Sequence, residues 1–113
     1  EYDCKALHAA AIVSDHIVGT ARMYKTQQGE TQIGRMAVDM KYRRQGIAER
    51  ILYFLENMAM HHGVIKLTLH AQIYVIGLYE KHSYIPQGKP FMDAGIKHVK
   101  MTKTIKQTKV CSP

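Results

Sequence analysis

The chain has 113 residues, enough for one small domain with a modest hydrophobic core. Hydrophobic residues make up 46% of it and charged residues 22%, and no segment approaches the ~20 apolar residues that a bilayer-spanning helix needs. We therefore predict a soluble globular protein without a membrane partner. The net charge of +7 favours either a polyanionic ligand, such as nucleic acid or a phosphorylated small molecule, or simply a basic surface.

The spacing of cysteines and histidines predicts no metal site. The two cysteines, Cys4 and Cys111, lie near the two ends of the chain and form no CxxC pair. A disulfide between them stays open, although two free thiols in a reduced, cytoplasmic protein are the expectation that we adopt. The adjacent His61 and His62 point to different sides of a helix, and no histidine pair has the spacing of metal ligands.

Three strands are predicted in the first third of the chain. Apolar runs over residues 5–13 and 17–24 are separated by a short polar turn, and a second turn at residues 27–30 leads into a strand over residues 31–38. Gly19 is expected at a bulge or at a point of close packing. Consecutive strands joined by short turns predict an antiparallel meander.

A basic loop and an amphipathic helix follow the third strand. Apolar residues between Ile47 and Ala59 recur at helical spacing, which predicts a helix over residues 45–62. Gly63 lies where the cap of its C-terminal end is expected. The loop over residues 41–44 places two arginines before the glycine at the helix start. Such a helix start is typical of phosphate sites, because its N–H groups are unpaired, its end is partly positive and glycine lets a ligand approach.

A further strand pattern lies directly after this helix. Ile65, Leu67 and Leu69 alternate with polar residues, which predicts a strand over residues 65–71. A strand–helix–strand unit forms a right-handed crossover. This strand is therefore expected to lie parallel to residues 33–38 in the same sheet.

The last third of the chain predicts a short helix and two more extended segments. We expect the helix over residues 74–82, an extended segment from residue 83, a loop over residues 90–95 and a last strand over residues 98–105. The fold class is therefore α/β (α+β): a mixed sheet with an antiparallel N-terminal meander, a strand–helix–strand crossover that forms a central parallel pair, a second helix and C-terminal strands. All 113 residues form a single domain, of which residues 106–113 are predicted to be a flexible tail.

Several motifs, in order along the chain, resemble one enzyme superfamily. The segment RRQGIA at residues 43–48 matches the Q/R-x-x-G-x-G/A signature of the GNAT superfamily of acetyl-CoA-dependent N-acetyltransferases, and LYEKHSY at residues 78–84 is similar to its (F/L)YEKxGF element. The strand that ends at Val38 precedes the signature, as in that family. More specifically, the chain resembles the ElaA/YjcF-like branch. That likeness is carried by Asp3, His8, GTAR at residues 19–22, LHAQ at residues 69–72 and FMDAGIKHVKM at residues 91–101.

The resemblance covers nearly the whole chain, with two departures. The chain begins near the family's second strand, so the first strand and the two helices after it, which help to form the acceptor pocket, are not in this sequence. We expect a homodimer or an exchanged strand to supply that cover. Ser83 stands where the family usually has glycine, a residue that suits a left-handed turn.

The resemblance implies that acetyl-CoA is the cosubstrate. In the family the two parallel strands splay apart, and the pantetheine arm is expected there along the main chain of Met36, Ala37 and Val38. The pyrophosphate is expected at the loop and helix start. The residues of that second group are Arg43, Arg44, Gln45, Gly46, Ile47 and Ala48. A surface arginine pair at a helix start is the alternative interpretation.

Two catalytic residues follow from the same resemblance. Tyr79 matches the tyrosine that gives a proton to the departing thiolate, and a phenol with a pKa near ~10 suits that role. A packing tyrosine is the alternative. His70, at the end of the second parallel strand, titrates in the range that a general base needs. A structural histidine, with water as the base, stays open, and Asp39 and His8 are further candidates.

The expected function is transfer of an acetyl group from acetyl-CoA to a primary amine of a small molecule or peptide, by direct attack of the amine on the thioester. The alternative is a non-catalytic CoA-binding or interaction module, since the N-terminal part of the acceptor site is missing. Nucleic acid is not favoured as a partner, because the basic residues lack interleaved aromatics and no recognition helix is evident.

Overall fold

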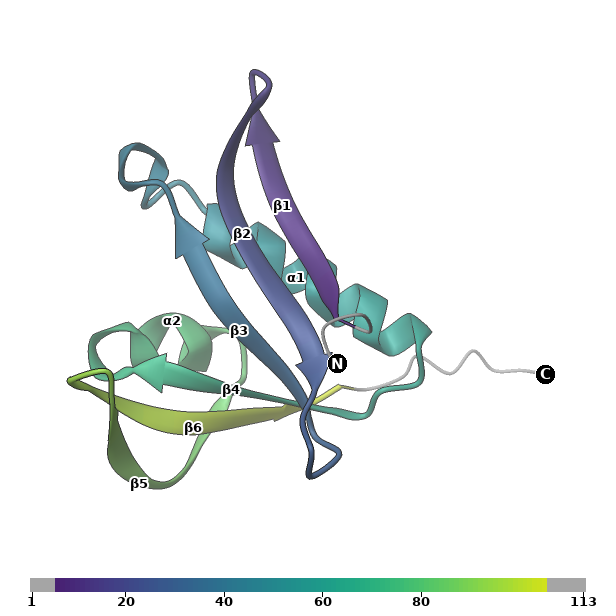
Figure 1. Cartoon of the computed structure of the whole chain (residues 1–113), viewed down its shortest axis with the longest axis vertical. Helices are drawn as coiled ribbons and strands as arrows, with labels where there is room; N and C mark the ends of the chain where they lie inside the picture. The colour runs from purple at the N-terminus through teal and green to yellow at the C-terminus, as the bar shows by residue number, and fades with distance from the viewer. Residues whose placement is uncertain (1–5, 106–113) are drawn as a thin grey trace.

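A computed structural model describes residues 6–105, which form a six-stranded mixed sheet with helices packed against it (Figure 1). The strand order is β1-β2-β3-β4-β6-β5, and β3 and β4 are the neighbours that run parallel. The elements in chain order are β1 (Leu7–Val13), β2 (His16–Lys25), β3 (Thr31–Val38), η2 (Met40–Tyr42), α1 (Ile47–His61), β4 (Lys66–Gln72), η3 (Ile73–Val75), α2 (Ile76–Lys81), β5 (Ile85–Asp93) and β6 (Ile96–Thr104). The predicted fold class is confirmed.

A β-bulge interrupts β3 near its middle. The register with β2 shifts between Thr20 and Arg22, so that Arg35 and Met36 together stand opposite Ala21. Arg35 has a φ of 56°, a left-handed conformation that costs a non-glycine residue about 1–2 kcal/mol. Such strain persists only where the surrounding structure fixes it, and it is common at functional sites.

Helix α1 covers one side of the β1–β3 meander and closes the core (Figure 1). Its buried residues are Ile47, Ile51, Leu52, Leu55 and Ala59. Gly19 of β2 makes the approach of α1 possible, because a Cβ atom there would lie 2.9 Å from Ile47 Cγ2 and 3.0 Å from Ile51 Cδ1. The close packing predicted for Gly19 is therefore confirmed.

Both helices end in the same type of cap. The residue that follows the cap has a left-handed backbone in each case, with a φ of 77° at Gly63 after α1 and 74° at Ser83 after α2. After α2, the N–H of Ser83 donates to the Glu80 carbonyl and the N–H of Tyr84 donates to the Tyr79 carbonyl, both at 3.0 Å. These are the bonds of a Schellman motif, which glycine favours. Ser83 thus takes the left-handed backbone conformation that is expected at this position, although the residue is not a glycine.

The prediction of a loop over residues 90–95 is wrong for residues 90–93. Strand β5 continues to Asp93, and only a two-residue turn, residues 94–95, leads into β6. Proline is tolerated in β5 because this is an edge strand, where a missing N–H can face away from the ladder. The predicted second helix is present as two consecutive pieces, η3 and α2.

The two faces of the meander differ in their cover. Buried Ala9 and Ala21 point toward α1, so the alternating residues His8 and Arg22 point to the opposite side of the sheet. We call that opposite side of β1, β2 and β3 the uncovered face, because no helix of residues 6–105 crosses it in Figure 1. No helix within the same residues is long and apolar enough to cross a membrane.

Candidate functional site

Strands β3 and β4 pair over only part of their length. Residues 31–33 of β3 pair with residues 67–69 of β4, and we call this the closed end of the seam. Beyond it, residues 34–38 and 70–72 form no ladder with each other, and the two ribbons diverge in Figure 1. We call this part the open end. The β3 peptide groups that point toward β4 at the open end lack partners in the sheet, so they are available to a ligand.

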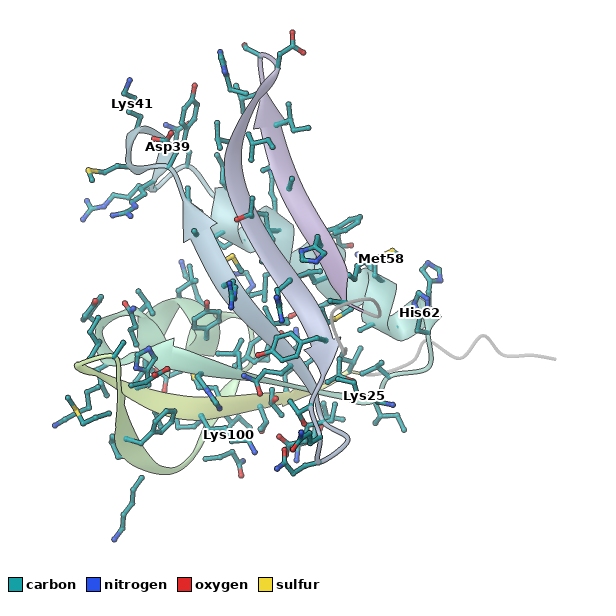
Figure 2. The ribbon with its side chains drawn as sticks, viewed as in Figure 1. Lys25, Asp39, Lys41, Met58, His62 and Lys100 are labelled. Atoms are coloured by element: carbon teal, nitrogen blue, oxygen red, sulfur yellow. The ribbon has the colours of Figure 1, made fainter. Side chains whose placement is uncertain are left out.

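The loop after β3 turns sharply before α1 begins. Asp39 starts the turn by accepting a hydrogen bond from the Lys41 N–H at 2.9 Å, and Figure 2 shows both residues at the tip of this loop. The Gln45 side chain donates to the Lys41 carbonyl at 3.4 Å. Arg44 and Gly46 then take left-handed conformations, with φ of 64° and 79°. Main-chain N–H groups in such loops can converge on an anion.

The first turn of α1 has no side-chain cap. Its N-cap is Gly46, and the first intrahelical bond at this end runs from the Arg50 N–H to the Gly46 carbonyl at 3.0 Å. The N–H groups of residues 47–49 are therefore left for a ligand or water. Arg43 Nε donates to the Val38 carbonyl at 3.2 Å, which ties the loop to the end of β3. This arrangement suits a phosphate group.

Tyr79 lies on α2, which Figure 1 shows between the diverging ribbons of β3 and β4. Its side chain is buried, and its ring packs edge-on against Tyr84 with the ring centroids 5.9 Å apart. Burial raises the pKa of Tyr79, so the phenol keeps its proton at neutral pH. Within residues 6–105 its hydroxyl has no hydrogen-bond partner and is not fully enclosed. A neutral phenol of this kind can donate a proton.

His70 lies near the end of β4, at the open end, and its side chain is exposed. Its ring packs edge-on against Phe91 with centroids 5.0 Å apart, and Phe91 stacks on His98 at 5.9 Å. Partial burial and then the nearby charge of Lys100 lower the pKa of His70. The imidazole is therefore neutral near pH 7 and can accept a proton.

The nine predicted cofactor-binding residues lie on consecutive parts of the chain. They occupy the open-end part of β3, the loop and the first turn of α1, whereas Tyr79 and His70 lie on α2 and β4. Asp39 caps η2, which gives it a structural role. His8 lies on β1 and faces away from α1. Among residues 6–105, no group of three or more His, Cys, Asp or Glu side chains is placed to hold a metal ion.

A partly buried polar network was not predicted from the sequence. The Tyr84 hydroxyl donates to Glu56 at 2.7 Å, and Lys103 Nζ lies 3.2 Å from both oxygens of that carboxylate. Burial and the neighbouring Glu56 raise the pKa of Tyr84. The network joins α1, the residue before β5, and β6, which are distant in sequence. No local pattern could therefore have indicated it.

The chain matches the acetyltransferase (GNAT) domain family over residues 3–105. YjcF of Bacillus subtilis (strain 168), named an uncharacterized N-acetyltransferase, is 30% identical over 104 residues, which cover 91% of this chain and 74% of that protein. The chain therefore belongs to the GNAT family of acetyltransferases. The predicted family is confirmed, and the protein is an acyltransferase.

Solved structures of other proteins share the fold. Escherichia coli ElaA has a TM-score of 0.79 and 22% identity over 87% of this chain and 68% of its own. A GNAT family acetyltransferase from Elizabethkingia anophelis, solved with acetyl-CoA bound, has a TM-score of 0.76 and 20% identity over 91% of this chain and 78% of its own. This chain thus spans 68% to 78% of the length of the three relatives named here.

Proposed function

We propose that the protein transfers the acetyl group of acetyl-CoA to a primary amine of a small molecule or peptide. The observation that carries this proposal is the open end of the β3–β4 seam directly beside the uncapped start of α1. An extended ligand with amide groups and a pyrophosphate needs both features in this order. The family relative with bound acetyl-CoA supports the choice of ligand.

The chain's own residues fit the two parts of that ligand. The main chain of Met36, Ala37 and Val38 offers hydrogen bonds to the pantetheine amides, because this stretch of β3 has no partner in β4. The N–H groups of Gly46, Ile47 and Ala48 suit the pyrophosphate. The cationic side chains of Arg43 and Arg44, together with Gln45, line the same loop.

In this proposal one residue accepts a proton from the amine and another donates a proton to the leaving group. His70 takes a proton from the incoming ammonium group, which leaves a neutral amine. The amine nitrogen then forms a bond to the thioester carbonyl carbon, and the bond from that carbon to sulfur breaks. The protonated Tyr79 hydroxyl gives its proton to the departing thiolate sulfur, and the second proton that the amide nitrogen loses returns to the Tyr79 oxygen through water, which restores the phenol. Direct transfer of this kind needs no acetylated enzyme intermediate.

A two-part experiment tests the proposal. Acetyl-CoA is first titrated into the full chain by calorimetry, and binding is expected to weaken when the loop charge is removed in Arg43→Gln with Arg44→Gln. Release of free thiol is then followed with a panel of primary amines. The result expected is amine-dependent thiol release; absence of acetyl-CoA binding would refute the proposal. Binding without thiol release for any amine would instead support the non-catalytic CoA-binding module.

A further inference from the structure

A glutamate in the first turn of α1 lies beside the helix start that is proposed to bind the pyrophosphate. Glu49 is the third residue of α1, and a Cβ atom built at Gly46 would lie 3.7 Å from Glu49 Oε1. The carboxylate is therefore close to the main chain whose N–H groups suit a phosphate. A negative charge at this place opposes the binding of a second anion.

A glutamate at this helix position often has a different hydrogen bond. In the capping box, the side chain of the third helical residue accepts a hydrogen bond from the N–H of the N-cap residue, which here is Gly46. A carboxylate in that conformation lies at the positive end of the helix, where a phosphate would otherwise bind. Within residues 6–105, Glu49 is bonded to a side chain at the end of α2 and not to the Gly46 N–H.

His82, the C-cap residue of α2, holds the Glu49 carboxylate. Its Nε2 atom donates to Glu49 Oε2 at 2.9 Å, and the two side chains are 34% and 32% exposed. Lys81 Nζ lies farther from the same oxygen, at 3.9 Å, and its side chain is 69% exposed. The hydrogen bond from His82 is the main cause that lowers the pKa of Glu49, so the carboxylate is ionised at neutral pH. Its charge is permanent there, and its position depends mainly on His82.

The backbone that carries the His82 imidazole is fixed on both sides. The His82 N–H and the Tyr84 N–H both donate to the Tyr79 carbonyl, each at 3.0 Å. The Tyr84 hydroxyl donates to Glu56 at 2.7 Å. Glu49 and Glu56, which lie about two turns apart on α1, therefore both bind the segment that follows α2. The imidazole can thus hold Glu49 in one place.

We propose that His82 is a positioning residue for the cofactor: by holding Glu49, it leaves the uncapped N–H groups of α1 to the pyrophosphate of acetyl-CoA. The inference rests on the proposed acetyl transfer and adds a residue of α2 that acts on the phosphate site through Glu49. Without His82, the carboxylate bonds the Gly46 N–H and competes with the phosphate. A partly exposed pair of this kind contributes little to stability, so its main effect is on ligand affinity.

Two variants at residue 82 test this role by calorimetry with acetyl-CoA and the full chain. His82→Leu removes the donor, and the dissociation constant should rise about fivefold because the released carboxylate competes with the pyrophosphate. His82→Gln keeps an N–H donor and should keep the affinity within about twofold. His61→Leu, the same change at the other end of α1, is the matched control and should leave the affinity unchanged. Unchanged affinity in His82→Leu would overturn the proposal.

Removal of Glu49 distinguishes this role from a loss of structure. In His82→Leu with Glu49→Ala no carboxylate is left to compete, so acetyl-CoA affinity should return to within about twofold of the wild-type value. Glu49→Ala alone should also keep the affinity, because the wild-type carboxylate is already held away from the helix start. A pair with a merely structural role would give a loss of affinity that persists in the double variant, and that result would refute the proposal.

A shortened substrate locates the effect within the cofactor. S-acetylpantetheine lacks the pyrophosphate and the nucleotide, so His82→Leu should leave its KM unchanged and raise KM for acetyl-CoA about fivefold. The kcat at saturating acetyl-CoA should stay within about twofold of the wild-type value. Equal increases of KM for both substrates would place the effect outside the phosphate site and contradict the proposal.

Two measurements without turnover separate this inference from the proposed reaction. Exchange of the Gly46 amide hydrogen should slow about threefold or more in His82→Leu, because Glu49 then accepts its hydrogen bond, and should not slow in the double variant. Inorganic pyrophosphate should bind more weakly to His82→Leu, as followed by the amide shifts of residues 46–48. Failure of wild-type protein to bind acetyl-CoA would refute the acetyl transfer. Unchanged Gly46 exchange and unchanged pyrophosphate binding in His82→Leu would refute the role of His82.

Discussion

The polar groups are paired with each other at the closed end of the β3–β4 seam, whereas at the open end the main chain of β3 has no partner in β4. At the closed end the groups pair with each other: Thr68 Oγ1 donates to the Thr31 carbonyl at 3.4 Å, and Lys100 binds Glu30 across the sheet. At the open end the main chain of residues 34–38 has no partner in β4, and the start of α1 has no side-chain cap. Substitutions at the closed end should therefore change stability, and those at the open end should change binding or turnover.

The largest expected difference is in kcat, between the phenylalanine variants of the two packed tyrosines, Tyr79 and Tyr84. Tyr79→Phe keeps the ring but removes the proposed proton donor, and we expect kcat to fall about 100-fold with acetyl-CoA affinity unchanged. Tyr84→Phe is the matched control, because its hydroxyl is already committed to Glu56. It should lower the melting temperature and leave kcat within about twofold. An unchanged kcat in Tyr79→Phe would show that this tyrosine only packs.

Removal of the Glu56 carboxylate should give the largest loss of stability. Glu56→Ala leaves the buried Tyr84 hydroxyl and the Lys103 ammonium without their acceptor, at a cost of about 1–3 kcal/mol. Denaturant unfolding measures this directly. Glu49→Ala removes a more exposed carboxylate on the same helix, which bonds His82 at 2.9 Å. Its effect should be the smaller of the two; a larger one would contradict the assigned roles.

Valine substitutions at two glycines with left-handed backbones should separate an effect on acetyl-CoA affinity from an effect on stability. Gly46→Val places a β-branched residue at a φ of 79° at the helix start, and acetyl-CoA affinity should fall about tenfold or more because the N–H groups there are displaced. Gly29 has a φ of 86° in the turn between β2 and β3, away from the proposed site. Gly29→Val should lower stability and leave affinity unchanged, as calorimetry would reveal.

The smallest expected effect is a gain of stability at the end of α2. Ser83→Gly relieves a left-handed strain of about 1–2 kcal/mol and adds about 0.5–1 kcal/mol of chain entropy to the unfolded state, so a net gain of about 0.5–1 kcal/mol is expected. Ser83→Ala keeps the strain and should give no gain in the same unfolding assay. A glycine variant less stable than wild type would mean that the serine side chain contributes more than the strain.

Local patterns made β3, α1 and the parallel crossover predictable. Strand β3 has the predicted bounds, and α1 starts within two residues of its predicted start because its apolar period and Gly46 are readable in the sequence itself. The loop expected over residues 90–95 is mostly strand, since the edge position that admits Pro90 depends on the strand order. The bulge at Arg35 depends on register with β2. The extended strand and the bulge both depend on how two segments pair, which the pattern of a single segment does not indicate.

The candidate site follows the same division. The cofactor residues fall in two short stretches, 36–38 and 43–48; the signature motif indicates the second, and the strand that directly precedes it in the sequence indicates the first. The Glu56–Lys103 pair, by contrast, spans 47 positions. Their proximity arises only when the sheet forms. Residues 106–113, with the predicted flexible tail, and both cysteines lie outside the described part of the chain.

The short ladder between β3 and β4 also has a consequence for how the domain opens. Three residue pairs join the meander to the β4–β6–β5 half, where most neighbouring strands share longer ladders. Sub-global opening should begin at this joint and release two cooperative units, one built on β1–β3 and one on β4–β6. Amide hydrogens of residues 31–33 should then exchange together, and a ligand that spans the open end would slow their exchange by fastening the two units.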